Sequence, residues 1–206
     1  MDLLNTFVVL FVVVDPVGNA PIFAALTRGL NEVDRRRLAI KGVAIATAIL
    51  LVFFAVGSPL LEALGIGIPA FRVAGGAFLF LIAIDMVFAR QSGLRSATAS
   101  EQAEARERQD ISIFPLAFPL IAGPGAITTV LLMASEGGGW DVQATRLGMI
   151  LLVLGLTLAS LLATARLVRL LGETGANVID RVLGLLLAAI AVQFILDGLR
   201  AAFHLG

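Results

Sequence analysis

Six long apolar segments constrain the fold of this chain more than any other feature of its sequence. Each segment reaches or exceeds the roughly 20 residues that a helix needs to cross the hydrocarbon of a bilayer. The hydrophobic share of the 206 residues is 59%, against roughly 45–50% in soluble domains. We therefore expect an all-α polytopic membrane protein, whose six transmembrane helices cover about residues 3–27, 38–62, 69–89, 111–134, 145–170 and 178–203.

The composition also argues against several classes of function. The formal net charge is zero, which does not favour a nucleic-acid partner. The sequence has no cysteine, so neither a disulfide nor a thiolate metal site is expected, and its one histidine, His204, argues against a histidine relay. No serine–histidine pair, metal-ligand cluster or ATP-binding motif is evident. We expect no enzymatic activity, no metal site and no cofactor other than a coupling ion.

Lysine and arginine residues are distributed unevenly between the two sides of the membrane that this topology defines. Only Arg72, Arg146 and Arg200 fall on one side, whereas the other twelve lie in or beside the connections that follow the first, third and fifth segments. The positive-inside rule then predicts that both termini are outside and that residues 90–110 are cytoplasmic. The first segment is expected to act as its own uncleaved insertion signal.

The two halves of the chain carry similar motifs at corresponding places. Arg72 opens the stretch RVAGG and Arg181 opens RVLG, near the starts of the third and sixth segments. Prolines also recur five residues apart in the first and fourth segments. Because each half contains three segments, a second copy must be inverted across the membrane, as in many secondary transporters. We expect a first three-helix repeat over 1–89, a linker over 90–110 and a second repeat over 111–206, which together form one transmembrane domain.

Prolines and small polar residues interrupt the first and fourth segments near their middles. The first contains the stretch DPVGNAP and the fourth contains FPLAFPLIAGPGAITT. Proline removes a backbone donor and breaks a helix, and in lipid such a break persists only where protein or water satisfies the freed groups. We expect two half-helices around Asp15–Asn19, with Asn19 as the N-cap and Pro21 in the first turn. A second break is expected at Gly123, with Pro124 opening the second half-helix.

The start of each second half-helix is expected to offer free backbone N–H groups and a positive dipole end, which together suit a carboxylate. We expect these donors near Gly18–Ala20 and Gly123–Gly125, while Asp15 and Asn19 bind an ammonium group or a coupling ion, H⁺ or Na⁺. A small zwitterion would satisfy both sets of groups. The predicted substrate-binding residues are Asp15, Gly18, Asn19, Ala20, Pro21, Gly123, Pro124, Gly125, Thr128 and Gln193.

Each of these features also has a purely structural interpretation. The breaks can be simple kinks, and the glycines and alanines can serve helix packing alone. The Thr128 hydroxyl can bond its own helix, and Gln193 can bridge two helices. Arg72 and Arg181 are expected to act as anchors or loop ligands, and Asp85 to lie at the membrane surface.

The motifs resemble those of the MarC family of bacterial inner-membrane proteins, which is also grouped with six-span neutral amino acid transporters. The resemblance rests on five stretches, DPVGNAPIF, RVAGG, PLAFPLIAGPGAIT, RVLG and VQFILDG, which are spread over essentially the whole chain. It implies a bacterial inner-membrane location and, for some members, uptake of glycine or alanine coupled to an ion gradient. Asp197 departs from the asparagine that is expected in some relatives.

Together these features predict a secondary transporter of small neutral amino acids, coupled to protons or Na⁺, that works by alternating access. The expected partners are a small-molecule substrate and the lipid bilayer, and small-residue faces on the third and fifth segments would permit a homo-oligomer. Three alternatives stay open. They are an exporter of other small metabolites or drugs, a channel, and a membrane protein that assembles with or regulates others without transport.

Overall fold

The computed structural model describes residues 3–88 and 111–203, and all regular structure in these two stretches is helical. The all-α prediction is therefore confirmed. The predicted linker at 90–110 and His204 lie outside the described residues. The elements in chain order are α1 (Leu3–Val14), α2 (Asn19–Leu26), α3 (Glu32–Ala63), α4 (Ile68–Phe88), η1 (Ser112–Ile121), α6 (Pro124–Ser135), α7 (Trp140–Leu162) and α8 (Thr164–Phe203).

Five stretches in the described part of the chain are long and apolar enough to cross a membrane, and the pair η1–α6 raises the number to six. The first stretch, Leu4–Leu26, joins α1 and α2 across a short break, and the last is the Thr174–Phe203 part of α8. The η1–α6 pair is bent by 59° at its own break. Large apolar side chains such as Val52, Leu151 and Leu185 are exposed on these helices, which suits a lipid environment. These lengths agree with the prediction of a six-span membrane protein.

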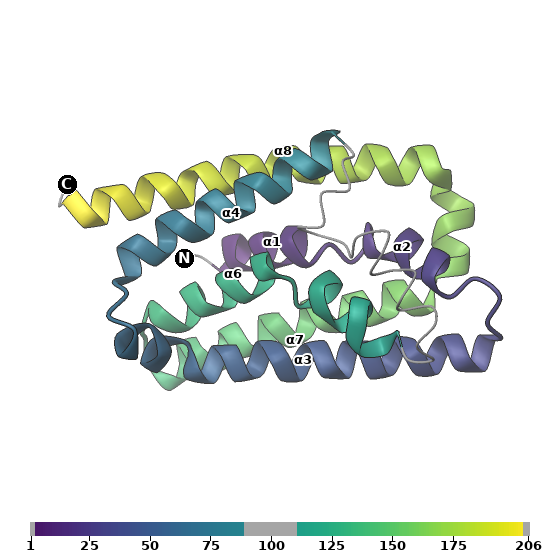
Figure 1. The fold of residues 1–206 in the computed structure, drawn as a ribbon, viewed down its shortest axis with the longest axis horizontal. Coiled ribbons are helices and arrows are strands. Elements are labelled where there is room, and N and C mark those ends of the chain that lie inside the picture. Colours follow the sequence, from purple (N-terminus) through teal and green to yellow (C-terminus); the bar gives the residue numbers. More distant parts are fainter. Residues whose placement is uncertain (1–2, 89–110, 204–206) are drawn as a thin grey trace.

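The chain between the fifth and sixth spans differs from the prediction. The span predicted over 145–170 is α7, which runs over Trp140–Leu162 and ends well before residue 170. The next stretch, residues 164–172, lies across the end of the bundle before the chain turns into the long part of α8 (Figure 1). Gly172 makes the turn with a φ of +62°, which glycine adopts without strain. Two arginines make this crossing segment, as we call residues 164–172, too polar to continue through the hydrocarbon.

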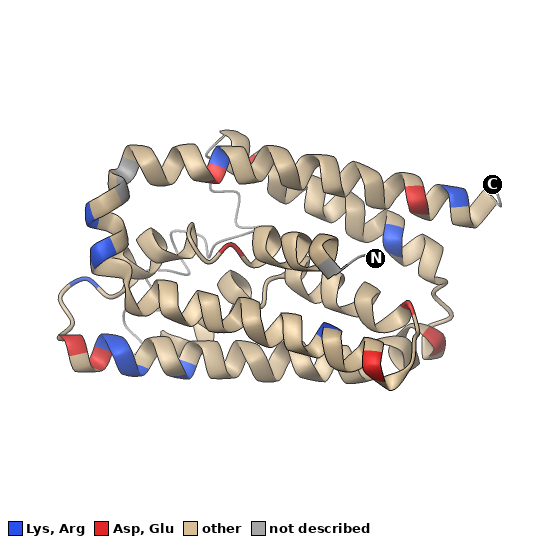
Figure 2. Cartoon of the chain, turned by 180° about the vertical axis from the view of Figure 1, so that it is seen from behind, with Lys and Arg blue, Asp and Glu red and all other residues tan. Residues whose placement is uncertain are grey.

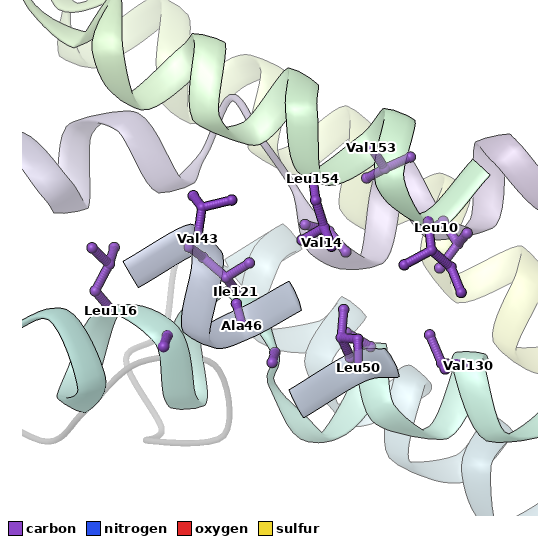
Figure 3. Close-up of a cluster of buried hydrophobic side chains, with 14 of the residues drawn as sticks. Leu10, Val14, Val43, Ala46, Leu50, Leu116, Ile121, Val130, Val153 and Leu154 are labelled. Carbon is purple, nitrogen blue, oxygen red and sulfur yellow. The ribbon is translucent and has the colours of Figure 1, made fainter. Parts of the chain in front are cut away.

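Most of the buried apolar side chains form two large clusters that share α1 and α6. The first cluster joins α1, α3, η1, α6 and α7, and includes Leu10, Leu50 and Leu154 (Figure 3). The second cluster joins α1, α4, α6 and α8, and includes Val12 and Leu187. As a result, α1 and α2 run through the middle of the molecule, with α4 and α8 on one side and α3 and α7 on the other (Figure 1).

Glycines allow α4 and α8 to pack against each other at very short range. A Cβ atom on Gly76 would lie 2.7 Å from the Ala191 carbonyl oxygen, and one on Gly184 would lie 2.7 Å from Met86 Cβ. Side chains of any size are therefore excluded at these contacts, as at other close helix crossings in membranes. Gly76 and Gly184 belong to the RVAGG and RVLG stretches. The inverted relationship between the two halves that these stretches suggested stays a prediction.

Most charged residues lie towards the two ends of the bundle (Figure 2). Most of the described arginines lie at the end formed by the α2–α3 connection, the first turns of α3 and the crossing segment, which we call the basic end. The opposite end is formed by the starts of α1, α4 and α7 and the end of α8, and it carries Arg72, Arg146 and Arg200. The uneven distribution of basic residues expected from the sequence therefore holds for the described residues.

Candidate functional site

The chain passes from α1 to α2 through a buried break at Asp15–Gly18. Asp15 is only 1% exposed, and its φ of +48° lies in the left-handed region that few residues other than glycine adopt. Aspartate tolerates this region better than most residues because its short side chain can bond the nearby backbone. Such a bond is present, because the Gly18 N–H donates to Asp15 Oδ1 at 2.9 Å. The carboxylate of Asp15 thus holds the turn between the two half-helices.

Two other side chains bind the backbone carbonyls that this break releases. Asn19 Nδ2 donates to the Val14 carbonyl oxygen at 2.8 Å. Ser160 Oγ, which comes from α7, donates to the Pro16 carbonyl oxygen at 2.5 Å. Unsatisfied backbone groups are costly in a bilayer, so an interrupted helix needs partners of this kind. The first break persists at membrane depth because the chain supplies its own hydrogen-bond donors.

The prediction that Asn19 is the N-cap of the second half-helix is wrong. Gly18 occupies the N-cap position and Asn19 is the first residue of α2, and the Asn19 side chain turns back to bond the Val14 carbonyl. Pro21 lies in the first turn of α2, as expected. The Asn19 N–H donates to the Asp15 carbonyl at 3.1 Å, and the Ala20 N–H is bonded within the turn at 3.2 Å. The first donors of α2 are therefore already used by the chain itself.

Asp180 of α8 joins the first break, which the sequence reasoning missed. A Cβ atom added to Gly18 would fall against Asp15 Oδ2 and 2.6 Å from Asp180 Oδ1. Carboxylates from two different spans therefore face the same small space, and only glycine leaves room for them. The available signal was an acidic residue inside the span predicted over 178–203. Asp180 precedes Arg181 at the start of that span, where charged residues commonly mark a membrane surface, so its position in the sequence does not by itself point to the break.

The second break matches its prediction closely. α6 begins at Pro124 with Gly123 as its N-cap, and no side chain caps the first turn. A Cβ atom on Gly123 would collide with the Pro119 carbonyl oxygen, so the break requires glycine here. The preceding η1 is irregular, with extended backbone at Phe114 and Phe118 and cis peptide bonds to the prolines that follow them.

The start of α6 differs from the start of α2 in its hydrogen bonding. The N–H groups of Gly125 and Ala126 make no hydrogen bond with any described residue, and the first bonded N–H of this helix is that of Ile127, at 3.0 Å from the N-cap carbonyl. A Cβ atom on Gly125 would lie 3.1 Å from Val13 Cγ1, close to the end of α1. The two breaks are therefore neighbours, and apolar side chains of α1 and α4 pack against Gly125.

Two further predicted residues do not join the breaks. The methyl group of Thr128 fills the space beside Gly75, and so packs α6 against α4. Gln193 donates from Nε2 to Asp197 Oδ1 at 2.8 Å on its own helix. With a rise of about 1.5 Å per residue, Gln193 lies about 20 Å along α8 from Asp180. Gln193 is therefore far from the first break.

Gln193 instead lines a cavity of about 540 Å³ at the end opposite the basic end. Glu136 of this cavity pairs with Arg72 Nη2 at 2.8 Å and with Arg146 Nη2 at 3.4 Å. These pairs join α4, the end of α6 and the start of α7, so Arg72 does act as an anchor, while Glu136 was not foreseen. The lining residues are Asn5, Arg72, Glu136, Ile190, Gln193, Phe194 and Asp197.

The second apolar cluster separates this cavity from the first break. Along α1, Asn5 lines the cavity, Val9 and Val12 belong to the cluster, and Asp15 follows the end of the helix. Along α8, Phe194 belongs to both the cavity wall and the cluster. The molecule thus combines a polar cavity that begins at one end, an apolar barrier below it, and two buried helix breaks beyond.

Comparisons with known proteins agree with the membrane fold. A family model described as MarC family integral membrane protein matches residues 2–203. The UPF0056 membrane protein YvbG of Bacillus subtilis is 39% identical over 202 residues, which cover 98% of this chain and 95% of that protein. The UPF0056 inner membrane protein YhgN of Escherichia coli K12 is 34% identical over 200 residues, which cover 97% of this chain and 96% of that protein. A UPF0056 membrane protein of Archaeoglobus fulgidus is 36% identical over 195 residues, covering 94% and 90%. No solved structure matches the chain.

Proposed function

We propose that this chain, which belongs to the MarC family of integral membrane proteins, is a secondary transporter of small neutral amino acids such as glycine and alanine. The observation that carries the proposal is the buried meeting of two interrupted spans, with Asp15 at one break and the free N–H groups of α6 at the other. Interrupted helices that face each other near the bilayer midplane form the substrate sites of many secondary transporters.

The two breaks offer complementary groups for a small zwitterion. Backbone N–H groups of Gly125 and Ala126 would bind the carboxylate, helped by the positive end of the α6 dipole. Asp15, joined by Asp180, would bind the ammonium group or the coupling ion, a proton or Na⁺. The space beside Gly18 is narrow, since even a Cβ atom on this residue would fall against the Asp15 carboxylate. A small amino acid suits such a site better than a bulky one.

Transport would proceed by alternating access between the two ends of the bundle. The 540 Å³ cavity would admit substrate from one end, and the apolar cluster below it would act as the closed gate. The glycine contacts make α4 and α8 a close pair that could move as one body against α3 and α7. The basic end would face the cytoplasm, because basic residues stay on the cytoplasmic side during insertion. Both termini would then lie outside, in the inner membrane of a bacterial cell.

Uptake of labelled glycine and alanine into proteoliposomes tests the proposal, with proton or Na⁺ gradients imposed in turn. Saturable uptake that depends on one gradient is the expected result. Asp15→Asn should lower that uptake at least tenfold, because the substitution removes the negative charge of the buried Asp15 carboxylate from this break. Glu62→Gln is the matched control, since Glu62 is exposed at the end of α3 and should leave uptake within twofold of the unmodified protein.

Two results would contradict the proposal. Folded protein that takes up neither amino acid in either orientation would point to another cargo, to export, or to a role without transport. Uptake that does not saturate and needs no gradient would indicate a channel. Equal losses in Asp15→Asn and Glu62→Gln would leave transport standing but would remove the first break from the site.

A further inference from the structure

The arginines at the two ends of the bundle differ in their ion pairing. At the cavity end every one of them has a carboxylate partner. Arg72 and Arg146 pair with Glu136 at 2.8 and 3.4 Å, and Arg200 Nη1 lies 3.9 Å from Asp197 Oδ1. Glu136 therefore pairs with the two largely buried arginines of this end, while the Arg200 pair is more exposed.

The described residues of the basic end contain no comparable buried ion pair. Arg35 lies 3.7 Å from Glu32, but that glutamate is 90% exposed, and exposed pairs of this kind contribute little. Several other side chains here form no ion pair or hydrogen bond with any described residue. They are Arg28, Arg36, Arg37, Arg166 and Arg169. Basic residues gather on the first turns of α3, on the connection before it and on the crossing segment (Figure 2). This end therefore has positive charge available for an external anion.

A groove of about 200 Å³ lies at the basic end between the start of α3 and the end of α7. Its lining residues are Glu32, Arg35, Arg36, Leu161 and Leu162. Two arginines thus lie beside the exposed Leu162, at the place where α7 ends and a transmembrane helix reaches the membrane surface. Leu162 is 42% exposed and continues the apolar surface of α7. This combination matches a molecule with an anionic head and an apolar chain.

The crossing segment extends this surface along the membrane plane. It lies across the end of the bundle, and it carries Arg166 and Arg169 together with exposed Val168 and Leu170, the latter 82% exposed. Short helices that combine arginines with exposed aliphatic side chains lie at the boundary between headgroups and acyl chains. The groove therefore opens at the depth where phospholipid headgroups are found.

We propose that this groove binds the headgroup of an anionic phospholipid. Arg35 and Arg36 contact the phosphate, and one acyl chain packs against the exposed Leu162 and continues along the outer face of α7. Basic pockets between helices at a membrane surface are suited to such headgroups. The phosphate displaces the weak, exposed pair between Arg35 and Glu32. This lipid site is separate from the proposed transport site and does not depend on transport.

Native mass spectrometry of the full chain in a neutral detergent tests the lipid site. Phosphatidylglycerol and phosphatidylcholine are added in turn, and the dissociation constant of the first bound lipid is measured for each. The double variant Arg35→Gln/Arg36→Gln should bind phosphatidylglycerol roughly thirtyfold more weakly, as expected for two arginines near a lipid phosphate. The matched control, Arg28→Gln/Arg37→Gln, removes the same charge from the same end outside the groove and should change binding less than threefold.

Each other outcome would overturn the proposal. Equal losses in the two double variants would mean that the basic end attracts lipid only through its general charge. Equal affinity for phosphatidylcholine would mean that the arginines do not select the headgroup. A third arm uses inorganic phosphate alone, at millimolar concentration, as a competitor. Complete displacement of the lipid by phosphate would identify an anion site rather than a lipid site. A thermal unfolding curve for each variant confirms that it is folded before binding is compared.

Discussion

Replacing Ser160 by alanine should weaken the first break by removing its link to α7. Ser160 Oγ donates to the Pro16 carbonyl oxygen at 2.5 Å, and Pro16 is a buried residue in the middle of the break. The substitution removes one oxygen and leaves the rest of the side chain unchanged. The Pro16 carbonyl then loses the donor that α7 supplied to it.

The expected cost follows from the geometry of this bond. Hydrogen bonds between transmembrane helices contribute about 0.6 kcal/mol on average and about 1.7 at most. This bond is short and its acceptor belongs to a buried residue, so the loss of its donor carries part of the desolvation penalty as well. We expect the free energy of unfolding to fall by about 1.5 kcal/mol. The equilibrium constant for unfolding would then rise somewhat more than tenfold.

Ser58→Ala provides a matched control. Ser58 Oγ also donates to a carbonyl on another helix, that of Ala134, but at 3.4 Å. A bond of that length is weak, so its loss should cost less than about 0.5 kcal/mol. Unfolding of both variants is measured by steric trapping in bicelles, with the unmodified protein alongside. If Ser160→Ala proves neutral, or if the two variants lose equal stability, the break is not held by α7 and the reasoning fails.

Two further substitutions test the packing and the charges around the site by the same unfolding measurement. Gly18→Ala should lower the free energy of unfolding by about 1–3 kcal/mol, because its Cβ would fall between the Asp15 and Asp180 carboxylates. Gly148→Ala is the control and should be nearly neutral, because there is open space around Gly148. Equal losses in the two variants would contradict the crowding at Gly18. Glu136→Gln should lower the free energy of unfolding by about 3 kcal/mol, because it leaves the largely buried Arg72 and Arg146 without their carboxylate partner. A loss below about 0.5 kcal/mol would refute the idea that these ion pairs stabilise the fold.

The positions of the breaks could be predicted because proline acts locally. Pro124 cannot donate a backbone hydrogen bond, so a helix start at this residue follows from the sequence alone. The hydrogen-bond partners could not be predicted in the same way. Ser160 lies 144 residues from Pro16 in the chain, and nothing local links them. Asn19 resembled an N-cap by residue type, but tertiary structure gave its side chain a different acceptor.

The extent of the fifth span was mispredicted for a related reason. Four of residues 164–170 are apolar, and neither proline nor glycine separates them from the end of α7. Their two arginines instead place them across the basic end, and Gly172 then turns the chain into α8. A mean hydropathy is the same wherever the charged residues lie within the averaged stretch. The cavity around Glu136 was missed because its residues come from four helices, and no single stretch of sequence brings them together.

The two breaks are unequal in this conformation, and the inequality bears on how the protein would work. The break at Asp15 is closed by the chain itself, since its first N–H groups and the Val14 and Pro16 carbonyls are all bonded. The start of α6 keeps two donors unused. If the halves are inverted copies that exchange conformations, the opposite state must free the first donors of α2 and close those of α6. A substrate carboxylate would then bind the two helix starts in turn. The hydrogen bond from the Ser160 hydroxyl to the Pro16 carbonyl would be broken and remade in each cycle.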